Sequence, residues 1–222
     1  MTSKSLHDEY WKLTPREAVA LQNELRGSVR LEDDFDRVKT VGGVDVAIGR
    51  GWKEGRCAIV VLSFPELEVI EFVKRSAPVD FPYVPGLLSF RELPLFLQVY
   101  EALGEKPDLI FFDGQGYAHP RRFGLACMAG LLIDKPTIGC AKSKLIGSCD
   151  EPGNEAGSVS PLFAPEGERI GDVARTKTGV KPIFVSPGHR VSFETATRLA
   201  LQCTRGYRVP EPTRQAHLLV SR

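Results

Sequence analysis

Three carboxylates in this sequence stand where an isolated charge would be costly. Asp45 lies inside the apolar run VGGVDVAI, residues 41–48, and Asp113 ends the apolar run DLIFFD, residues 108–113. A buried carboxylate is expensive unless it is paired, hydrogen-bonded or bound to a metal. Glu92 follows a proline-rich loop, at the point where a helical pattern begins. If the three carboxylates meet at strand ends, their oxygens would form a site suited to Mg²⁺ or Mn²⁺.

The residues that follow Asp113 strengthen this interpretation. Alone, each aspartate also fits a turn or a helix cap, and DGQG could be a simple turn. The sequence GQGYAHPRR, however, adds two glycines, His119 and two arginines, and glycines let backbone amides approach a ligand closely. The GQG segment partly matches a dinucleotide-binding fingerprint, but its third glycine position holds His119, so we regard dinucleotide binding as disfavoured.

Lys142 and His217 are two further candidate site residues. Lys142 follows the apolar run PTIGCA and is therefore expected at a strand end, where it could neutralise the charge of a phosphate or orient an attacking water. The alternative is a solvated loop lysine. His217 lies in a late helical segment, PEPTRQAHLLV, where it is a site candidate or simply a packed histidine.

The loop FPYVPGLLSFRE, residues 81–92, fits neither a core segment nor an ordinary surface segment. Two prolines flank Tyr83 and Val84, so the backbone is stiff and pairs poorly as a central strand. The loop thus presents an aromatic side chain at its tip and the carboxylate of Glu92 at its base.

The composition is that of an ordinary globular protein. The 222 residues are 42% hydrophobic and 26% charged, with a net charge of +1, so a polyanionic partner would need a local basic face. No apolar run reaches membrane-spanning length, and the N-terminus lacks the apolar core of a signal peptide. The five cysteines form no CxxC pair, which indicates reduced thiols in the cytosol or nucleus. We expect a cytoplasmic monomer without a membrane partner.

The chain predicts one mixed α/β domain over residues 1–222. Three strand-like runs come first, and the short Pro65-Glu66 turn between the last two indicates an antiparallel hairpin. Alternating helices and strands follow, which predicts a mixed sheet with helices on its faces and ligands at its strand ends. The expected strands are 38–48, 57–64, 67–75, 108–113, 136–141, 168–178 and 182–187; the expected helices are 88–103, 121–133, 192–203, 213–220 and one capped by Thr14, with Glu17 completing a capping box.

Six blocks of this sequence occur in an order that closely resembles endonuclease V. The blocks are VGGVDVA, FPYVPGLLSFRE, DLIFFDGQGYAHPRR, PTIGCAKSKL, PIFVSPGHRVS and RVPEPTRQAH. The match runs from near Tyr10 to near His217, almost the whole chain, and the second and third blocks are long and specific.

The resemblance implies a ribonuclease H-like fold, in agreement with three antiparallel runs followed by α/β alternation. It also implies hydrolysis of the second phosphodiester bond on the 3′ side of inosine, a deaminated adenine, with 3′-hydroxyl and 5′-phosphate ends. The reaction would need Mg²⁺ or Mn²⁺. The family's metal-binding carboxylates fall on Asp45, Glu92 and Asp113, and Lys142 and His217 match further active-site positions. DNA repair is the implied role, with RNA as an alternative substrate.

In this family the proline-braced loop acts as a wedge. Tyr83 would fill the space left by the extruded base, while the two prolines stiffen the loop. Extruding a base costs on the order of a few kcal/mol, and less for a poorly paired base such as inosine. The wedge residues are Pro82, Tyr83, Val84 and Pro85; the flipped hypoxanthine would lie against backbone groups of Gly86, Leu88, Gly114 and Leu125, near His119.

Two departures from the family pattern stand out. Cys127 and Met128 occupy positions where family members often have Ser and His, and Val84 replaces a commoner isoleucine. If that histidine touches the substrate, affinity or sequence preference would differ here.

Two other functions are open at this stage. A silent nucleic-acid binder on the same fold is disfavoured because all three carboxylates are kept, and a phosphatase or nuclease of another specificity would not need Tyr83. The sequence leaves open DNA against RNA, and one metal ion against two.

Overall fold

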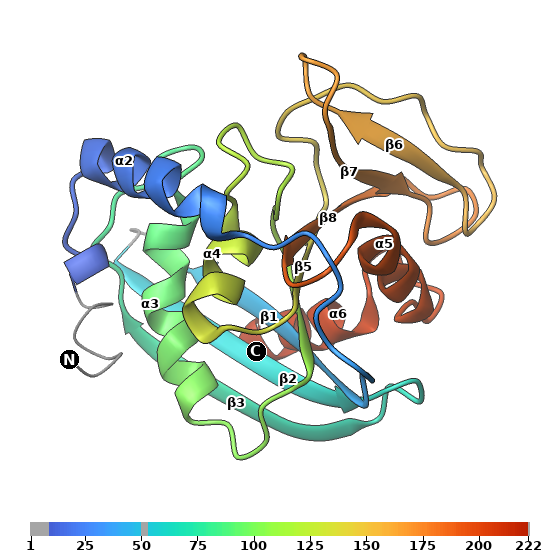
Figure 1. Cartoon of the computed structure of the whole chain (residues 1–222). Helices are drawn as coiled ribbons and strands as arrows, with labels where there is room; N and C mark the ends of the chain where they lie inside the picture. Colours follow the sequence, from blue (N-terminus) through green and yellow to red (C-terminus); the bar gives the residue numbers. More distant parts are fainter. Residues whose placement is uncertain (1–8, 50–52, 222) are drawn as a thin grey trace.

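The computed structural model describes residues 9–49 and 53–221, so His7, to which the sequence gives no role, lies outside the described part. These residues contain an eight-stranded mixed sheet in the order β3-β2-β1-β4-β5-β8-β7-β6 (Figure 1). The strands are β1 (Thr40–Ile48), β2 (Glu54–Ser63), β3 (Val69–Pro78), β4 (Leu109–Phe112), β5 (Thr137–Ala141), β6 (Val159–Phe163), β7 (Arg169–Ala174) and β8 (Ile183–His189).

The strand directions bring three chain segments to one edge of the sheet. Strands β1, β2 and β3 form an antiparallel meander, and β4 and β5 run parallel to β1. Val44 lies opposite Phe112, which in turn lies opposite Gly139, so the ends of β4 and β5 lie beside the middle of β1. This arrangement confirms the predicted ribonuclease H-like class and the predicted hairpin of β2 and β3.

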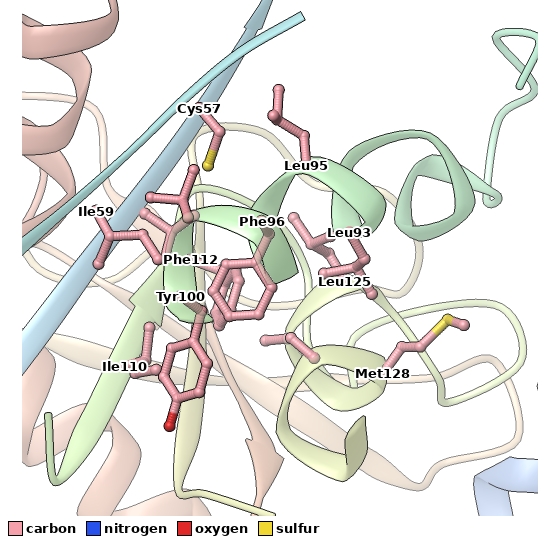
Figure 2. Packing of buried hydrophobic residues seen from close by; sticks show 14 of the residues in the cluster. Cys57, Ile59, Leu93, Leu95, Phe96, Tyr100, Ile110, Phe112, Leu125 and Met128 are labelled. Atoms are coloured by element: carbon pink, nitrogen blue, oxygen red, sulfur yellow. The ribbon is translucent and has the colours of Figure 1, made fainter. Parts of the chain in front are cut away.

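Helices cover both faces of the sheet, and strand alternation divides the core between them. Ile110 and Phe112 of β4 pack with one set of helices, whereas Leu109 and Phe111 pack with the other. Figure 2 shows part of the first core, including Phe96, Phe112 and Met128. The helices on the first face are α2 (Pro15–Leu25), α3 (Leu88–Glu101) and α4 (Leu125–Ile133); those on the second are α5 (Phe193–Gln202) and α6 (Glu211–Val220).

Local sequence signals set several helix starts. Thr14 and Glu17 form the predicted capping box of α2, which continues into the short 3₁₀ helix η1 (Arg26–Ser28). The side chain of Ser192 accepts a hydrogen bond from the Thr195 N–H and so caps α5.

Over residues 9–49 and 53–221, no helix has the length and apolar composition needed to cross a bilayer. All five cysteines are unpaired, and four of them are buried.

Several element ends are shifted by a few residues from the sequence prediction, and two differences are larger. The helix predicted over residues 121–133 begins only at Leu125, because Arg122 adopts a left-handed conformation with φ of 56° and Gly124 occupies the N-cap in an extended one. Strand β6 lies where the sequence analysis expected neither a strand nor a helix, and it was missed. This edge strand contains Pro161 and buries only Leu162, so it has no apolar run to reveal it.

Gly43 lets α6 lie directly against the sheet. A Cβ built on Gly43 would be 2.0 Å from both the carbonyl carbon and the oxygen of Pro212, and backbone atoms cannot yield as a flexible side chain can. The close approach of α6 to β1 therefore requires glycine at this position.

We expect Gly43→Ala to lower the free energy of unfolding by about 1–3 kcal/mol or more, the range typical of overpacking. Urea denaturation would measure the change. Gly27→Ala is a suitable control, because a Cβ at Gly27 would have no atom within 4 Å. Equal stability of Gly43→Ala and the wild type would show that α6 does not depend on this contact.

Candidate active site

Three carboxylates from three elements line one small pocket. Asp45 is the first β1 residue beyond the stretch paired with β4, Glu92 lies in the first turns of α3, and Asp113 directly follows β4. The pocket has a volume of about 10 Å³, which is room for roughly one water-sized sphere. Its other walls are apolar and include Leu93, Phe96, Phe112 and Leu125, all labelled in Figure 2.

The shared pocket makes Glu92 hard to ionise. Burial raises the pKa of Glu92 well above its ordinary value, and the negative charges of Asp45 and Asp113 raise it further. The positive charge of Arg91 opposes these effects only in part. A cation bound between the three carboxyl groups would favour the ionised form of Glu92.

A cationic or potentially cationic side chain stands beside each aspartate. His217 of α6 bonds through Nδ1 to Asp45 Oδ2 at 2.9 Å, and the Lys142 ammonium forms an ion pair with Asp113. The two aspartate side chains are 12% and 17% exposed, whereas His217 and Lys142 are about half exposed. All five residues predicted for the chemistry thus form one connected cluster around the central strands β1, β4 and β5.

The donor set matches a hard divalent cation in kind. Three carboxylates provide the oxygen ligands that Mg²⁺ and Mn²⁺ favour, and the pocket between them is apolar and small. In the described part of the chain, no three His, Cys, Asp or Glu side chains are already gathered closely enough to hold an ion. Asp45 and Asp113 are instead engaged, each through one oxygen, by His217 and Lys142.

Arg208 and Gln115, to which the sequence analysis gave no role at this site, fix the backbone that carries Lys142. Arg208 Nη2 donates to the Lys142 carbonyl at 2.5 Å and to the Pro182 carbonyl at 3.0 Å. Gln115 Nε2 donates to the Ser143 carbonyl at 2.9 Å. The lysine on this exposed loop is thus held from two sides, through contacts between residues far apart in sequence.

The proline-braced loop projects beside the carboxylate pocket. Tyr83 at its tip is 60% exposed, which is unusual for a large aromatic side chain. At the start of the loop, the buried side chain of Arg91 donates to the Phe81 carbonyl at 2.6 Å. Glu92, the next residue, lines the carboxylate pocket, so the first turns of α3 connect the loop to this pocket.

A larger pocket, of about 330 Å³, lies between this loop and the loop that follows β4. It shares Asp113 and Leu125 with the carboxylate pocket, so the two cavities adjoin. Its lining includes eight of the nine predicted substrate-binding residues; Pro82 lines a separate hollow together with Tyr83. The eight are Tyr83, Val84, Pro85, Gly86, Leu88, Gly114, His119 and Leu125.

His119 is held as a neutral ring in the wall of this larger pocket. Its Nε2 lies 3.0 Å from the Gly86 carbonyl oxygen, and its Nδ1 accepts the Arg121 backbone N–H at 3.2 Å. These partners place the proton on Nε2. Burial, followed by the charge of Arg121, lowers the pKa of His119 to about 4, so the ring stays uncharged at neutral pH.

Cys127 and Met128 do not take part in the surface of the site. Both side chains are fully buried in the core between the sheet and α4, and Figure 2 shows Met128 among these residues. The departure from the family pattern at position 128 therefore places a core residue there, not a side chain that can contact a substrate.

The sequence comparisons agree with this geometry. The family model for endonuclease V matches residues 23–218. An endonuclease V from Dehalococcoides mccartyi is 46% identical over 215 residues, which cover 97% of this chain and 95% of the relative.

Solved structures extend the agreement to the fold. Endonuclease V from Streptomyces avermitilis superposes with a TM-score of 0.90 at 45% identity, covering 95% of this chain and 93% of that one. Endonuclease V from Ciona intestinalis, solved with a 23mer DNA containing an inosine followed by a ribo-adenosine, has a TM-score of 0.83 at 32% identity, covering 94% and 97%. This chain belongs to the endonuclease V family.

Proposed function

We propose that this protein is a metal-dependent endonuclease that recognises inosine in a nucleic-acid strand. It hydrolyses the second phosphodiester bond on the 3′ side of the inosine and leaves 3′-hydroxyl and 5′-phosphate ends. Its biological role would be the repair of DNA that contains deaminated adenine, with RNA as a possible further substrate class.

The adjoining pockets carry this proposal. Asp113 lines both the carboxylate pocket and the 330 Å³ pocket, so a base held in the larger one places its strand beside the acidic residues. The larger pocket is of a size that small ligands occupy. The Ciona relative, whose structure contains inosine-bearing DNA, supports inosine as the base.

Asp45, Glu92 and Asp113 would hold the metal. When bound, Mg²⁺ supplies positive charge that polarises the scissile phosphate and lowers the pKa of a water molecule. Lys142 would add positive charge where the transition state gains negative charge. His217 would keep the Asp45 carboxylate oriented through the bond between Nδ1 and Oδ2.

Recognition would combine a wedge with a neutral pocket wall. Tyr83 is exposed on a stiff loop and would stack in the gap that the extruded base leaves. His119, neutral and with its proton on Nε2, gives the pocket a polar wall without adding charge. Backbone groups of Gly86, Leu88, Gly114 and Leu125 would complete the contacts to hypoxanthine.

The proposal is tested by incubating the protein with matched DNA and RNA oligonucleotides that carry one central inosine, in Mg²⁺ and in EDTA. We expect a single cut at the second bond 3′ to the inosine, in Mg²⁺ only, and the faster-cut strand identifies the preferred substrate. Cleavage in EDTA, or equal cleavage of an adenosine control, would refute the proposal.

Removing one carboxylate should separate binding from chemistry. We expect Asp45→Ala to lower the cleavage rate by more than about 100-fold, beyond the loss typical when only a neighbour of a metal ligand is removed. Binding of the inosine strand should persist, since the larger pocket and Tyr83 are untouched. Single-turnover cleavage and fluorescence anisotropy measure the two effects, and a wild-type rate in Mg²⁺ would end the assignment.

Removing the wedge aromatic should weaken binding instead. We expect Tyr83→Ala, made in the Asp45→Ala protein to prevent cleavage, to lower affinity for the inosine strand roughly tenfold, because base–aromatic stacking contributes about 1–3 kcal/mol. Phe72→Ala is the matched control: Phe72 is 57% exposed on β3 and lines neither pocket. An equal effect of both substitutions would show that Tyr83 has no special role.

A further inference from the structure

Gln22 is a polar side chain buried completely on helix α2. The other buried residue of this helix is Ala18, one turn earlier on the same face. A buried amide is costly unless its donors and acceptor are satisfied. The partners of Gln22 therefore show what this position is for.

The Gln22 amide joins the two loops that form the larger pocket. Its Nε2 donates to the Gly86 carbonyl and to the Phe123 carbonyl, each at 3.2 Å. Its Oε1 accepts from Arg121 Nε at 2.5 Å. Gly86 belongs to the proline-braced loop, whereas Arg121 and Phe123 belong to the loop after β4.

Three donors converge on one carbonyl oxygen. Besides Gln22 Nε2, the Gly86 oxygen receives Arg121 Nη2 at 2.8 Å and His119 Nε2 at 3.0 Å. Gly86 has a φ of +79°, and a Cβ there would lie 2.8 Å from Arg121 Nη2. The end of the loop is thus fixed in a conformation that suits glycine and is held by side chains from two other segments.

We propose that Gln22 is a positioning residue for base recognition. It acts through Gly86 and Arg121 to hold the proline-braced loop and the loop after β4, which both line the 330 Å³ pocket, at a fixed spacing. This inference rests on the proposed function and adds to it the residue that sets the selectivity of the pocket. Gln22 itself does not line the pocket.

A merely structural role predicts a different outcome from a positioning role. If Gln22 only anchors α2, its loss lowers stability and leaves the discrimination between bases unchanged. If it sets the pocket spacing, its loss lowers the ratio of affinities for inosine and adenosine strands while general strand binding persists. The ratio is therefore the readout that separates the two roles.

The test measures this affinity ratio by fluorescence anisotropy with matched strands, using Asp45→Ala protein as the parent. We expect Gln22→Met, which has similar length and no hydrogen-bonding amide, to lower the ratio roughly fivefold to tenfold, as loss of buried hydrogen bonds would. Gln22→Glu keeps an acceptor for Arg121 and should retain part of the selectivity. Ala18→Gly weakens α2 at a buried position without removing a hydrogen bond of Gln22, and it should keep the parental affinity ratio.

Each outcome bears on a distinct claim. A folded Gln22→Met protein with the parental ratio, or an Ala18→Gly protein that loses selectivity equally, overturns the positioning role while inosine recognition stands. A parent with no preference for inosine overturns the proposed function as well. Should Gln22→Met fail to fold, Arg121→Lys replaces it, because lysine lacks the forked guanidinium that bonds Gln22 and Gly86 together. A parental affinity ratio in Arg121→Lys would also refute the positioning role.

Discussion

The repulsion between three carboxylates in one apolar pocket is the constraint on which the rest of this structure depends. Like charges repel strongly in a site of low dielectric, so carboxylates stay close together only where the surrounding structure holds them in place. Two strands and a helix of the core hold the three carboxylates in place. Asp45 lies on β1, and Asp113 directly follows the adjacent parallel strand β4. Glu92 lies near the start of a helix packed on the sheet, and Phe96 and Phe112 line the same pocket.

Helix α6, on the second face of the sheet, supplies the partner of Asp45. His217 reaches Asp45 from α6, which lies close against β1 because Gly43 has no side chain. On the other flank, Lys142 meets Asp113 from a loop that Arg208 holds. The acidic pocket is thus bordered by the His217 ring, placed by α6, and by the Lys142 ammonium, placed at the end of β5.

Recognition is built into the same framework. Arg91 holds the first residue of the proline-braced loop, and Glu92, its neighbour in sequence, lines the carboxylate pocket. The last residues of the loop are held by the contacts on the Gly86 carbonyl. A base in the larger pocket and a phosphate at the acidic residues would therefore be positioned by one continuous rigid unit.

The sequence predicted those parts of the site that a local pattern reveals. Asp45, Asp113 and Lys142 were found because each interrupts or ends an apolar run, and the prolines around Tyr83 marked the exposed loop. The roles of Gln22 and Arg208 were not predicted because their partners lie 64 and 66 residues away, a pairing that no local period encodes. Strand β6 was missed for a different reason. It is an edge strand with one buried residue and so has no apolar run, whereas the fully buried strands β4 and β5 do.

The most direct test of the central claim is uptake of Mn²⁺ by the protein bound to an inosine strand with non-hydrolysable linkages on the 3′ side of the inosine, followed by electron paramagnetic resonance. If the three carboxylates exist to hold a cation, the wild-type complex takes up Mn²⁺ saturably, and Asp45→Ala and Asp113→Asn weaken that uptake strongly. A wild-type complex that binds no Mn²⁺, or binds it equally well without these carboxylates, would contradict this account.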